Sequence, residues 1–308
     1  MHIVISDDYQ DCIRSLDAFA LTRGHQVTIH HDTVTDLDAL AERFASADAI
    51  VLIRERTRIT DELLARLPRL RIIAQTGKVA GHIDLDACER RGVRVTEGQG
   101  AGTATVELTL LLILASLRNL VAEANHLRGG GWQRTLGHQL AGRTLGILGF
   151  GRIGSQVARI GGALGAKVLV GGRPSTLKKA VAAGFDIVAT QEEFLERSDI
   201  LSIHLRLTPE TQHLLDSRDL ARMRPGSLLV NTSRAEIIAP GALEQALNAG
   251  RPGRAAVDVF EEEPVLGARH PLVGRDDCLC TPHIGFVERD NYEAYFRSAF
   301  ESINAIAP

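Results

Sequence analysis

Residues 144–154 read TLGILGFGRIG, a short apolar run that ends in the pattern Gly149-x-Gly151-x-x-Gly154. Apolar residues then recur at helical spacing, so the glycines lie where a buried strand would turn into a helix. This context favours dinucleotide binding, because the glycines permit a tight turn and let a pyrophosphate approach the helix N-terminus. An ordinary glycine-rich turn is the alternative, and the rest of the chain must decide between them.

The composition is that of an ordinary globular protein. The chain has 308 residues, of which 44% are hydrophobic and 24% charged, and a net charge of −3. This length predicts two domains, and the charge gives no basis for binding nucleic acid or an anionic membrane. The most apolar run, residues 106–117, is too short to span a bilayer. With no N-terminal signal and only four cysteines, we expect a cytoplasmic protein.

Residues 1–98 predict a parallel sheet with helices on both faces, since strand patterns alternate with helical ones. The expected strands are 2–6, 26–30, 49–53, 71–74 and 93–96, and the expected helices are 10–21, 35–44, 61–67 and 84–91. Ligands bind beyond the C-terminal ends of such strands. Arg54 and the Lys78-Val79 pair follow the third and fourth strands. They either bind an anionic substrate or are solvated residues of a loop.

A glycine-rich connector, residues 98–102, predicts a hinge before a long helix from Thr103 to Leu127. That helix is apolar around much of its girth, which indicates burial against the other domain or a second subunit. Gly129-Gly130-Gly131 ends it, and Trp132 is expected to pack below it.

A second strand–helix series begins at the glycine motif. The expected strands are 144–149, 167–170, 186–189, 200–204, 227–231, 254–259 and 278–280, and the expected helices are 155–164, 176–183, 192–197, 217–223 and 240–249. A last helix, 294–306, is expected to return to the first domain. The sequence thus predicts two doubly wound α/β domains: a smaller flavodoxin-like substrate domain of residues 1–98 plus 287–308, and a Rossmann dinucleotide-binding domain of residues 99–286.

No metal site is predicted. His25, His30 and His31 are close in sequence but fall across a turn and a strand. Cys278-x-Cys280 resembles half of a metal site, yet no second cysteine pair accompanies it, and both residues fall in an expected strand.

Three further segments match one family in order and spacing: Asn231–Arg234 (NTSR), Asp258–Pro264 (DVFEEEP) and Thr281–Gly285 (TPHIG). Together with the glycine motif they resemble the D-isomer-specific 2-hydroxyacid dehydrogenases, and the resemblance covers nearly the whole chain. It implies an NAD(P)-dependent oxidoreductase that transfers a hydride between a nicotinamide cofactor and a small 2-hydroxy or 2-keto acid of the glyoxylate, hydroxypyruvate or 3-phosphoglycerate type.

The chemistry can also be argued from the residues. Reducing a 2-keto acid requires a cation to fix the carboxylate, an acid to protonate the alkoxide, and a carboxylate to orient that acid. Arg234, His283 and Glu263 each follow an expected strand of one parallel sheet. Because loops after such strands face one crevice, we expect the three to act together as catalytic residues.

The resemblance assigns further roles. Arg54, Lys78, Val79, Arg234 and His283 are the expected substrate contacts. The expected cofactor contacts are Thr105, Gly149, Gly151, Arg152, Ile153, Gly154, Arg173, His204, Thr211, Thr232, Ser233, Asp258, His283 and Gly285. A homodimer through the 103–127 helix is also expected.

Two departures from the family pattern stand out. The cofactor loop has Arg206 where His-x-Pro is common. The strand at 167–170 ends in Gly171-Gly172-Arg173, with Gly172 at the place of the acid that binds the ribose 2′-OH of NAD. We therefore expect NADP to be favoured over NAD.

Two other functions stay open at this point: a non-catalytic nucleotide-sensing co-repressor on the same fold, and a dehydrogenase of the formate or phosphite type. The sequence does not name the substrate.

Overall fold

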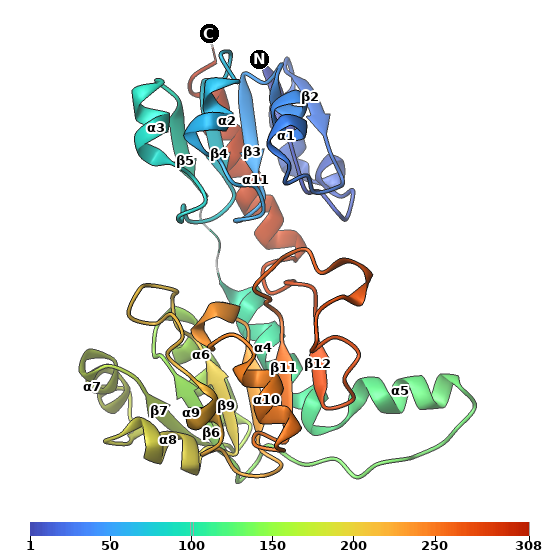
Figure 1. The fold of residues 1–308 in the computed structure, drawn as a ribbon, viewed down its shortest axis with the longest axis vertical. Coiled ribbons are helices and arrows are strands. Elements are labelled where there is room, and N and C mark those ends of the chain that lie inside the picture. Colours follow the sequence, from blue (N-terminus) through green and yellow to red (C-terminus); the bar gives the residue numbers. More distant parts are fainter. Residues whose placement is uncertain (99, 101, 308) are drawn as a thin grey trace. The chain divides into compact units, whose positions relative to one another are not determined.

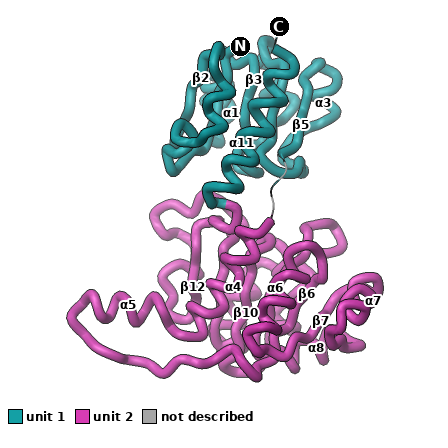
Figure 2. Tube along the Cα trace, turned by 180° about the vertical axis from the view of Figure 1, so that it is seen from behind, with its two compact units in different colours: residues 1–101, 287–308 teal, residues 102–286 magenta. Residues whose placement is uncertain are grey.

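The computed structural model describes residues 1–98, 100 and 102–307, and the chain divides into two compact units (Figure 1, Figure 2). Unit 1 comprises Met1–Ala101 and Val287–Pro308, and unit 2 comprises Gly102–Phe286. The second segment of unit 1 is the C-terminal end of the chain, which returns to the sheet formed by the first hundred residues.

Unit 1 contains a five-stranded sheet in the order β2-β1-β3-β4-β5, with every neighbouring pair parallel. This is the flavodoxin-like order. The strands are β1 His2–Ile5, β2 Gln26–Ile29, β3 Ala49–Leu52, β4 Ile72–Gln75 and β5 Arg94–Glu97. The helices are η1 Ile13–Ser15, η2 Asp17–Thr22, α1 Leu37–Phe44, α2 Asp61–Ala65, α3 Leu85–Arg90 and α11 Arg289–Asn304.

Helices cover both faces of this sheet (Figure 1). α1, α2 and α3 pack on one face and share an apolar core with the strands through residues such as Phe44 and Leu63. α11 packs with η2 against β4 and β5 on the other face. Asp36, Thr60 and Asp84 cap the three short helices, each accepting a backbone N–H bond from the third residue of its helix.

Unit 2 contains a seven-stranded parallel sheet in the order β12-β11-β10-β9-β6-β7-β8. The strands are β6 Thr144–Leu148, β7 Lys167–Gly171, β8 Asp186–Ile187, β9 Ile200–Ile203, β10 Leu228–Asn231, β11 Arg254–Val257 and β12 Cys278–Cys280. The strand order reverses between β6 and β9, and ligands of doubly wound sheets bind at such a switch point.

Two apolar layers enclose the sheet of unit 2. The helices are α4 Thr103–Leu117, α5 Leu120–Arg128, α6 Arg152–Ala163, α7 Pro174–Ala182, α8 Gln191–Arg197, α9 Ser217–Leu220 and α10 Ala242–Asn248, with short η3 Ala235–Ile237 and η4 Leu266–Ala268. α4 and α6 share one core with the sheet, and α8, α9 and α10 share the other. The predicted fold of two parallel α/β sheets is confirmed, and the predicted strand ends differ from those observed by no more than two residues.

Three helix predictions were wrong in extent. Residues 10–21 form the two 3-10 turns η1 and η2, because Leu16 between them is extended. The helix predicted over 103–127 is two helices bent by 64°, because Asn119 adopts a left-handed conformation with φ 51°. The last helix begins at Arg289, where Glu288 caps it, rather than at residue 294.

Two further expectations concern the ends of the long helix. Trp132 is 73% exposed and does not pack below the helix, so that prediction was wrong. The predicted hinge at residues 98–102 includes Gln99 and Ala101, which lie outside the described residues.

Candidate active site

The glycine motif forms the turn from β6 into α6. Gly149 has φ 97°, and a Cβ there would lie 2.5 Å from the carbonyl oxygen of His204, so only glycine fits. A Cβ on Gly154 would lie 2.1 Å from the Gly149 carbonyl oxygen, which shows how closely α6 approaches the turn. Gly151 caps α6 without a side-chain hydrogen bond and has open space at its Cβ position. The residues therefore fit a pyrophosphate held by backbone N–H groups, with Arg152 and Ile153 as the first two helical residues.

His204 follows β9 and borders the glycine turn. Its Nε2 lies 2.8 Å from the Ser202 hydroxyl oxygen, and its Cβ would be 3.1 Å from a Cβ on Gly154. Burial lowers the pKa of His204 to about 4, so its imidazole is neutral at physiological pH. The same loop closes on itself, since Thr211 Oγ1 donates to the Arg206 carbonyl and accepts from Thr208 N.

His283 and Glu263 meet beyond the ends of β12 and β11. His283 Nδ1 lies 2.6 Å from Glu263 Oε2, while Glu263 Oε1 accepts the N–H of Phe260 at 3.0 Å. The carboxylate is thus fixed on one side by the backbone and orients the imidazole with its other oxygen, which leaves Nε2 as the nitrogen pointing away from the carboxylate. The imidazole also packs edge to face against Phe286, with 5.5 Å between ring centroids.

Asp258 holds the loop that carries His283. Its Oδ1 accepts the Thr281 hydroxyl at 2.6 Å and the Ile284 N–H at 2.8 Å, and its Oδ2 accepts the Gly285 N–H at 2.8 Å. Burial raises the pKa of Asp258, although these hydrogen bonds oppose that effect. His283 has φ 49°, a conformation that is costly for a non-glycine residue, and the three bonds around it stabilise that conformation.

Thr105 ties the same loop to α4. Its hydroxyl donates to the Gly285 carbonyl at 2.8 Å, and its own carbonyl accepts from Thr109, whose hydroxyl lies 2.8 Å from that of Thr232. Two of the predicted cofactor contacts, Thr105 and Thr232, therefore belong to one chain of hydrogen bonds across α4.

Arg234 lies in the loop after β10. Its Nη1 donates to the Ser233 carbonyl at 2.7 Å, and its own carbonyl accepts from the Asn231 side chain at 2.9 Å. Ser233 Oγ donates to the carbonyl of Ile203 at the end of β9, which fixes this loop against the neighbouring strand. Asn231 belongs to the NTSR motif but was assigned no role of its own, and its place at the last residue of β10 was the available signal.

Arg173 is the N-cap of α7 and is exposed, and Gly172 before it has φ 148°. A Cβ on Gly172 would lie 3.0 Å from Thr176 Cγ2, so an acidic residue would be strained there. The pKa of Glu210 is lowered, mainly by its hydrogen bond with Thr208. The positive charge of Arg173 makes a smaller contribution in the same direction, so the Glu210 carboxylate lies near enough to interact with Arg173.

Arg54 of unit 1 sits at the C-terminal end of β3 with φ 60°. Two side chains at the end of β4 hold its backbone. The Arg54 N–H donates to Thr76 Oγ1, and the Arg54 carbonyl accepts from Gln75 Nε2. Its guanidinium lies against Gly77, where a Cβ would be 2.3 Å from Nη1, and it donates to the Tyr295 hydroxyl of α11 at 3.4 Å. Tyr295 is 241 residues away in sequence, and no sequence signal pointed to it.

Lys78 and Val79 are engaged by one carboxylate. Lys78 Nζ lies 2.5 Å from Glu97 Oε2, and the Val79 N–H donates to Glu97 Oε1 at 2.7 Å. Glu97 is the last residue of β5, so the loop after β4 is tied to the neighbouring strand end.

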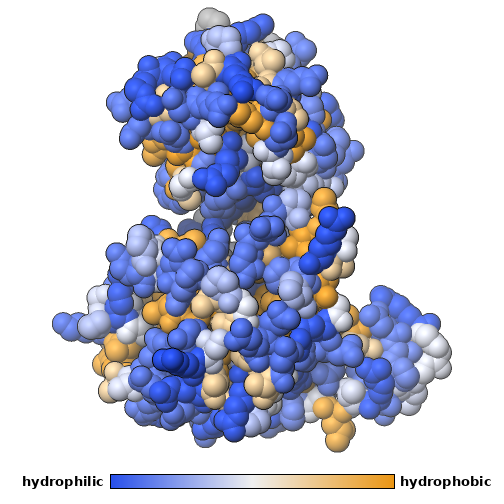
Figure 3. All heavy atoms as spheres, in the orientation of Figure 1, coloured by the Kyte–Doolittle hydropathy of each residue, from blue (hydrophilic) through white to orange (hydrophobic). Residues whose placement is uncertain are grey.

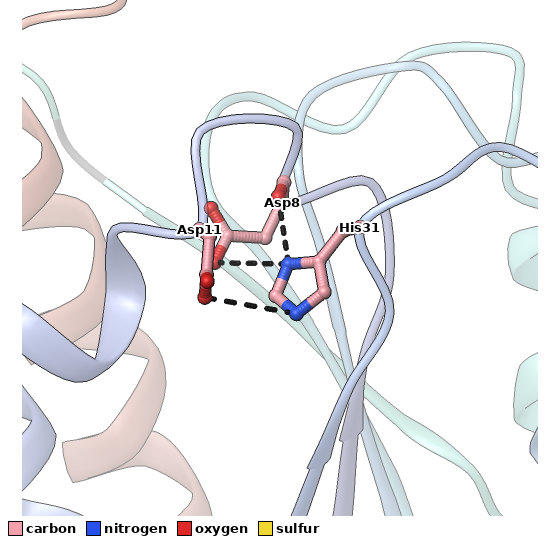
Figure 4. Close-up of side chains that lie close together, drawn as sticks. All are labelled: Asp8, Asp11 and His31. Atoms are coloured by element: carbon pink, nitrogen blue, oxygen red, sulfur yellow. Dashed lines mark hydrogen bonds and ion pairs between the residues drawn. The ribbon is translucent and has the colours of Figure 1, made fainter.

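Asp8, Asp11 and His31 form a cluster in unit 1 (Figure 4), with ligand-type atoms within 4.8 Å of one another. His31 Nε2 lies 3.6 Å from Asp11 Oδ1, and His31 Nδ1 lies 3.0 Å from the Asp8 carbonyl oxygen. Asp8 is buried and its carboxylate accepts the N–H groups of Cys12 and Ile13. Hydrogen bonds and ion pairs among these three residues and their neighbours account for the cluster without a cation. That the chain has no metal site is still a prediction.

Among the described residues, no single helix has both the length and the apolar character needed to cross a membrane. α4 and α5 reach those limits only as a pair with the 64° bend between them.

Comparison with known proteins gives the family of the chain. Residues 110–285 match the family model of the D-isomer specific 2-hydroxyacid dehydrogenase, NAD binding domain. The chain is 39% identical over 282 residues to a glyoxylate reductase of Aeropyrum pernix, covering 88% of this chain and 83% of that protein. It is 34% identical to a D-3-phosphoglycerate dehydrogenase of Methanocaldococcus jannaschii, where the match covers 80% of this chain and 47% of that protein.

Among solved structures, a putative D-3-phosphoglycerate dehydrogenase from Ralstonia solanacearum is 46% identical, with a TM-score of 0.97 and coverage of 99% of this chain and 94% of that one. The family model spans more than half of the chain, and the Aeropyrum relative matches over most of both lengths. The chain therefore belongs to the D-isomer-specific 2-hydroxyacid dehydrogenase family and is an oxidoreductase that transfers a hydride between a nicotinamide cofactor and a small 2-hydroxy or 2-keto acid.

Proposed function

We propose that the chain reduces a small 2-keto acid of the glyoxylate or hydroxypyruvate type, with His283, Glu263 and Arg234 as its catalytic residues. The observation that carries the proposal is the 2.6 Å contact between His283 Nδ1 and Glu263 Oε2. A carboxylate at Nδ1 holds the ring so that its Nε2 can give a proton to an oxygen that gains negative charge.

Each residue then has a separate task. When bound, the nicotinamide cofactor supplies the hydride. Arg234 binds the carboxylate of the 2-keto acid through its planar guanidinium, which can make two parallel hydrogen bonds. His283 gives the Nε2 proton to the carbonyl oxygen as it becomes an alkoxide, and Glu263 keeps the ring in place. Arg54, Lys78 and Val79 remain predicted substrate contacts.

The substrate is tested with a panel of 2-keto acids: glyoxylate, hydroxypyruvate, pyruvate and 2-ketoglutarate, with consumption of reduced nicotinamide followed by absorbance. We expect the two small substrates to give the highest kcat/KM. Turnover of formate or phosphite alone, or of no compound at all, would contradict the proposal.

Arg234→Lys tests the carboxylate contact. Lysine keeps the charge but cannot make two parallel bonds, so KM for the keto acid should rise far more than KM for the nucleotide. Equal changes in both would make Arg234 a scaffold or cofactor residue.

We propose further that NADP(H) is preferred over NAD(H). Gly172 leaves no carboxylate to repel a 2′-phosphate, and the exposed Arg173 beside it can pair with one. Ser175 and Thr176 add hydroxyls in the first turn of α7. Glu210 opposes this preference, because its charge interacts with Arg173.

Two variants test the cofactor preference in opposite directions. Arg173→Ala should lower the ratio of kcat/KM for NADPH to that for NADH, by about tenfold if the pair contributes about 1.4 kcal/mol. Glu210→Gln should raise the same ratio. A wild-type preference for NADH would contradict the proposal that this loop binds the 2′-phosphate. An unchanged ratio of kcat/KM values in Arg173→Ala would contradict it as well.

We also propose a homodimer through α4, α5 and the chain that follows. None of the residues of α5 is buried, and α5 with the chain that follows it, residues 120–139, projects from the rest of unit 2 in both views (Figure 1, Figure 2). This segment is called the arm below, and its surface is mostly hydrophilic in Figure 3. Exposed apolar side chains are Leu111, Leu114, Leu120, Val121, Leu127, Trp132 and Leu136. This is more than a monomer needs to expose in one place.

Sedimentation velocity at micromolar concentration should show a dimer. Leu127→Glu combined with Leu136→Glu should give a monomer. Leu266→Glu is the control outside the arm and should leave the dimer intact, since the exposure of Leu266, 72%, lies between the 58% of Leu127 and the 95% of Leu136. A monomeric wild type would overturn the proposal.

A further inference from the structure

Cys278 and Cys280 are the two ends of β12, the terminal strand of the unit 2 sheet. Side chains two residues apart in a strand point to the same face, and the two sulfur atoms lie 3.7 Å apart. Cys278 is buried, while Cys280 is partly exposed and its thiol reaches the Leu272 carbonyl at 3.4 Å. The pair therefore combines an accessible sulfur with a buried one in contact with it.

The other two cysteines of the chain are different. Cys12 and Cys88 lie in unit 1, and burial raises the pKa of each thiol to about 11, so both stay protonated at neutral pH. The hydrogen bond between the paired thiols has opposite effects on its members: it lowers the pKa of Cys280 and raises that of Cys278. The partly exposed member, Cys280, is thus the more readily ionised, and the thiolate is the reactive form of cysteine.

We propose that Cys278 and Cys280 form an oxidation site, at which a peroxide converts the two thiols into a disulfide within β12. The reaction takes place in two steps. The Cys280 thiolate attacks one oxygen of hydrogen peroxide, so that an S–O bond forms, the O–O bond breaks, and the leaving hydroxide takes up a proton to become water. The Cys278 sulfur then attacks the sulfenic sulfur of Cys280, so that the S–S bond forms and the S–O bond breaks. The hydroxide released takes the Cys278 proton, and two thiols have given two electrons to one peroxide.

The bond requires the backbone of β12 to change locally. The Cα atoms of residues two apart in a strand are about 6.4–6.8 Å apart, at the long end of the range that disulfides span. Their parallel Cβ atoms are about as far apart, beyond the roughly 3.5–4.5 Å that separates Cβ atoms in a disulfide. Closing the sulfur separation from 3.7 Å therefore shortens or puckers the strand between the two residues. As a terminal strand, β12 pairs with β11 alone, so fewer ladder hydrogen bonds resist the change.

The change in β12 affects the loop that carries His283, the candidate general acid. Cys280 is followed by Thr281, whose N–H donates to the Val257 carbonyl and whose hydroxyl donates to Asp258. His283 is two residues further on, in the loop that these bonds hold. Loss of one such hydrogen bond costs about 1 kcal/mol, so we expect oxidation to lower turnover about fivefold.

The modification is tested by mass. The protein is reduced, treated with increasing hydrogen peroxide, alkylated with iodoacetamide and digested with trypsin. Cleavage after Arg275 and Arg289 releases residues 276–289, which contain both cysteines of the pair and neither of the others. We expect this peptide to lack two hydrogens and carry no alkyl group, while the peptides with Cys12 and Cys88 stay alkylated. Alkylation of both sulfurs, or sulfinic or sulfonic acids at Cys280 without a disulfide, would overturn the proposal.

Activity gives the second readout. Peroxide should slow the wild-type enzyme about fivefold, the loss expected from one hydrogen bond, and dithiothreitol should restore the rate. Cys278→Ser, Cys280→Ser and the double variant should keep their rate in peroxide, whereas Cys12→Ser, the matched control in unit 1, should be inhibited like wild type. Inhibition of the double variant would show that the disulfide is not the cause. The mass readout does not require turnover, so failure of the keto-acid assay would leave the oxidation site testable.

Discussion

Two histidines, His204 and His283, follow strands of the unit 2 sheet. Their surroundings differ, and the difference distinguishes a structural histidine from one that can donate a proton. His204, after β9, bonds to the Ser202 hydroxyl, borders the glycine turn and is neutral, because burial lowers its pKa to about 4. His283, after β12, faces the Glu263 carboxylate at 2.6 Å in a loop held by Asp258. A histidine at a strand end is therefore not by itself a proton donor, and the carboxylate next to it makes the difference. Four predictions test this contrast.

The largest effect is expected for His283→Asn. Loss of the proton donor should reduce the rate of keto-acid reduction by about 10²–10⁴-fold, the usual contribution of general acid catalysis. The affinity for the reduced nucleotide, measured by fluorescence titration, should hardly change. His204→Gln is the matched control, and a comparable fall in its rate would erase the distinction between the two histidines.

Glu263→Gln should have the next largest effect. The amide can still accept a bond from the Phe260 N–H, but it no longer offers a charge to His283. Loss of a charged hydrogen bond, worth about 1.5–3 kcal/mol, should lower kcat about tenfold to hundredfold. An unchanged rate would restrict Glu263 to a structural role.

Thr281→Val removes one of the three bonds to Asp258 while keeping the shape of the side chain. The Ile284 and Gly285 N–H groups still hold the carboxylate, so we expect kcat to fall only about fivefold, with KM for the nucleotide unchanged. Thr211→Val, which removes a hydroxyl from the loop after β9, serves as the comparison. A larger fall of kcat in Thr211→Val than in Thr281→Val would show that the loop after β9 matters more for turnover than the His283 loop.

The smallest effect on turnover is expected for His204→Gln, and its signature is stability. The pKa of His204 is about 4 in the folded protein against a usual value of 6.5, so the unfolded chain binds the proton more readily. The free energy of unfolding should therefore fall as pH decreases from about 6.5 to about 4, and this fall should be smaller in the variant. Denaturant titrations at several pH values measure it, and parallel curves would show that the imidazole is not buried in the folded state.

Much of the site could be predicted because its residues adjoin elements with strong local signals. Arg234, Glu263 and His283 follow apolar runs that read as strands, and parallel strands place such loops at one edge. What could not be predicted were the bonds to backbone groups that hold these loops in place. Asp258 was expected to contact the cofactor, and the structure adds its hold on the Thr281–Gly285 loop, which depends on backbone groups rather than on residue types.

The sequence by itself determined the twelve strands, the glycine turn and the two α/β sheets, because apolar runs and glycines act through local geometry. Only the tertiary structure decided where the long helix breaks and which groups hold the loop that carries His283. The break at Asn119 is stabilised by Arg254, which bonds to the Ser116 carbonyl and to Asn119 Oδ1 from more than a hundred residues away. The bonds from Asp258 to the Ile284 and Gly285 N–H groups likewise join two segments that follow neighbouring strands of the sheet. Contacts of this kind depend on how distant segments pack, and no local pattern of residues encodes them.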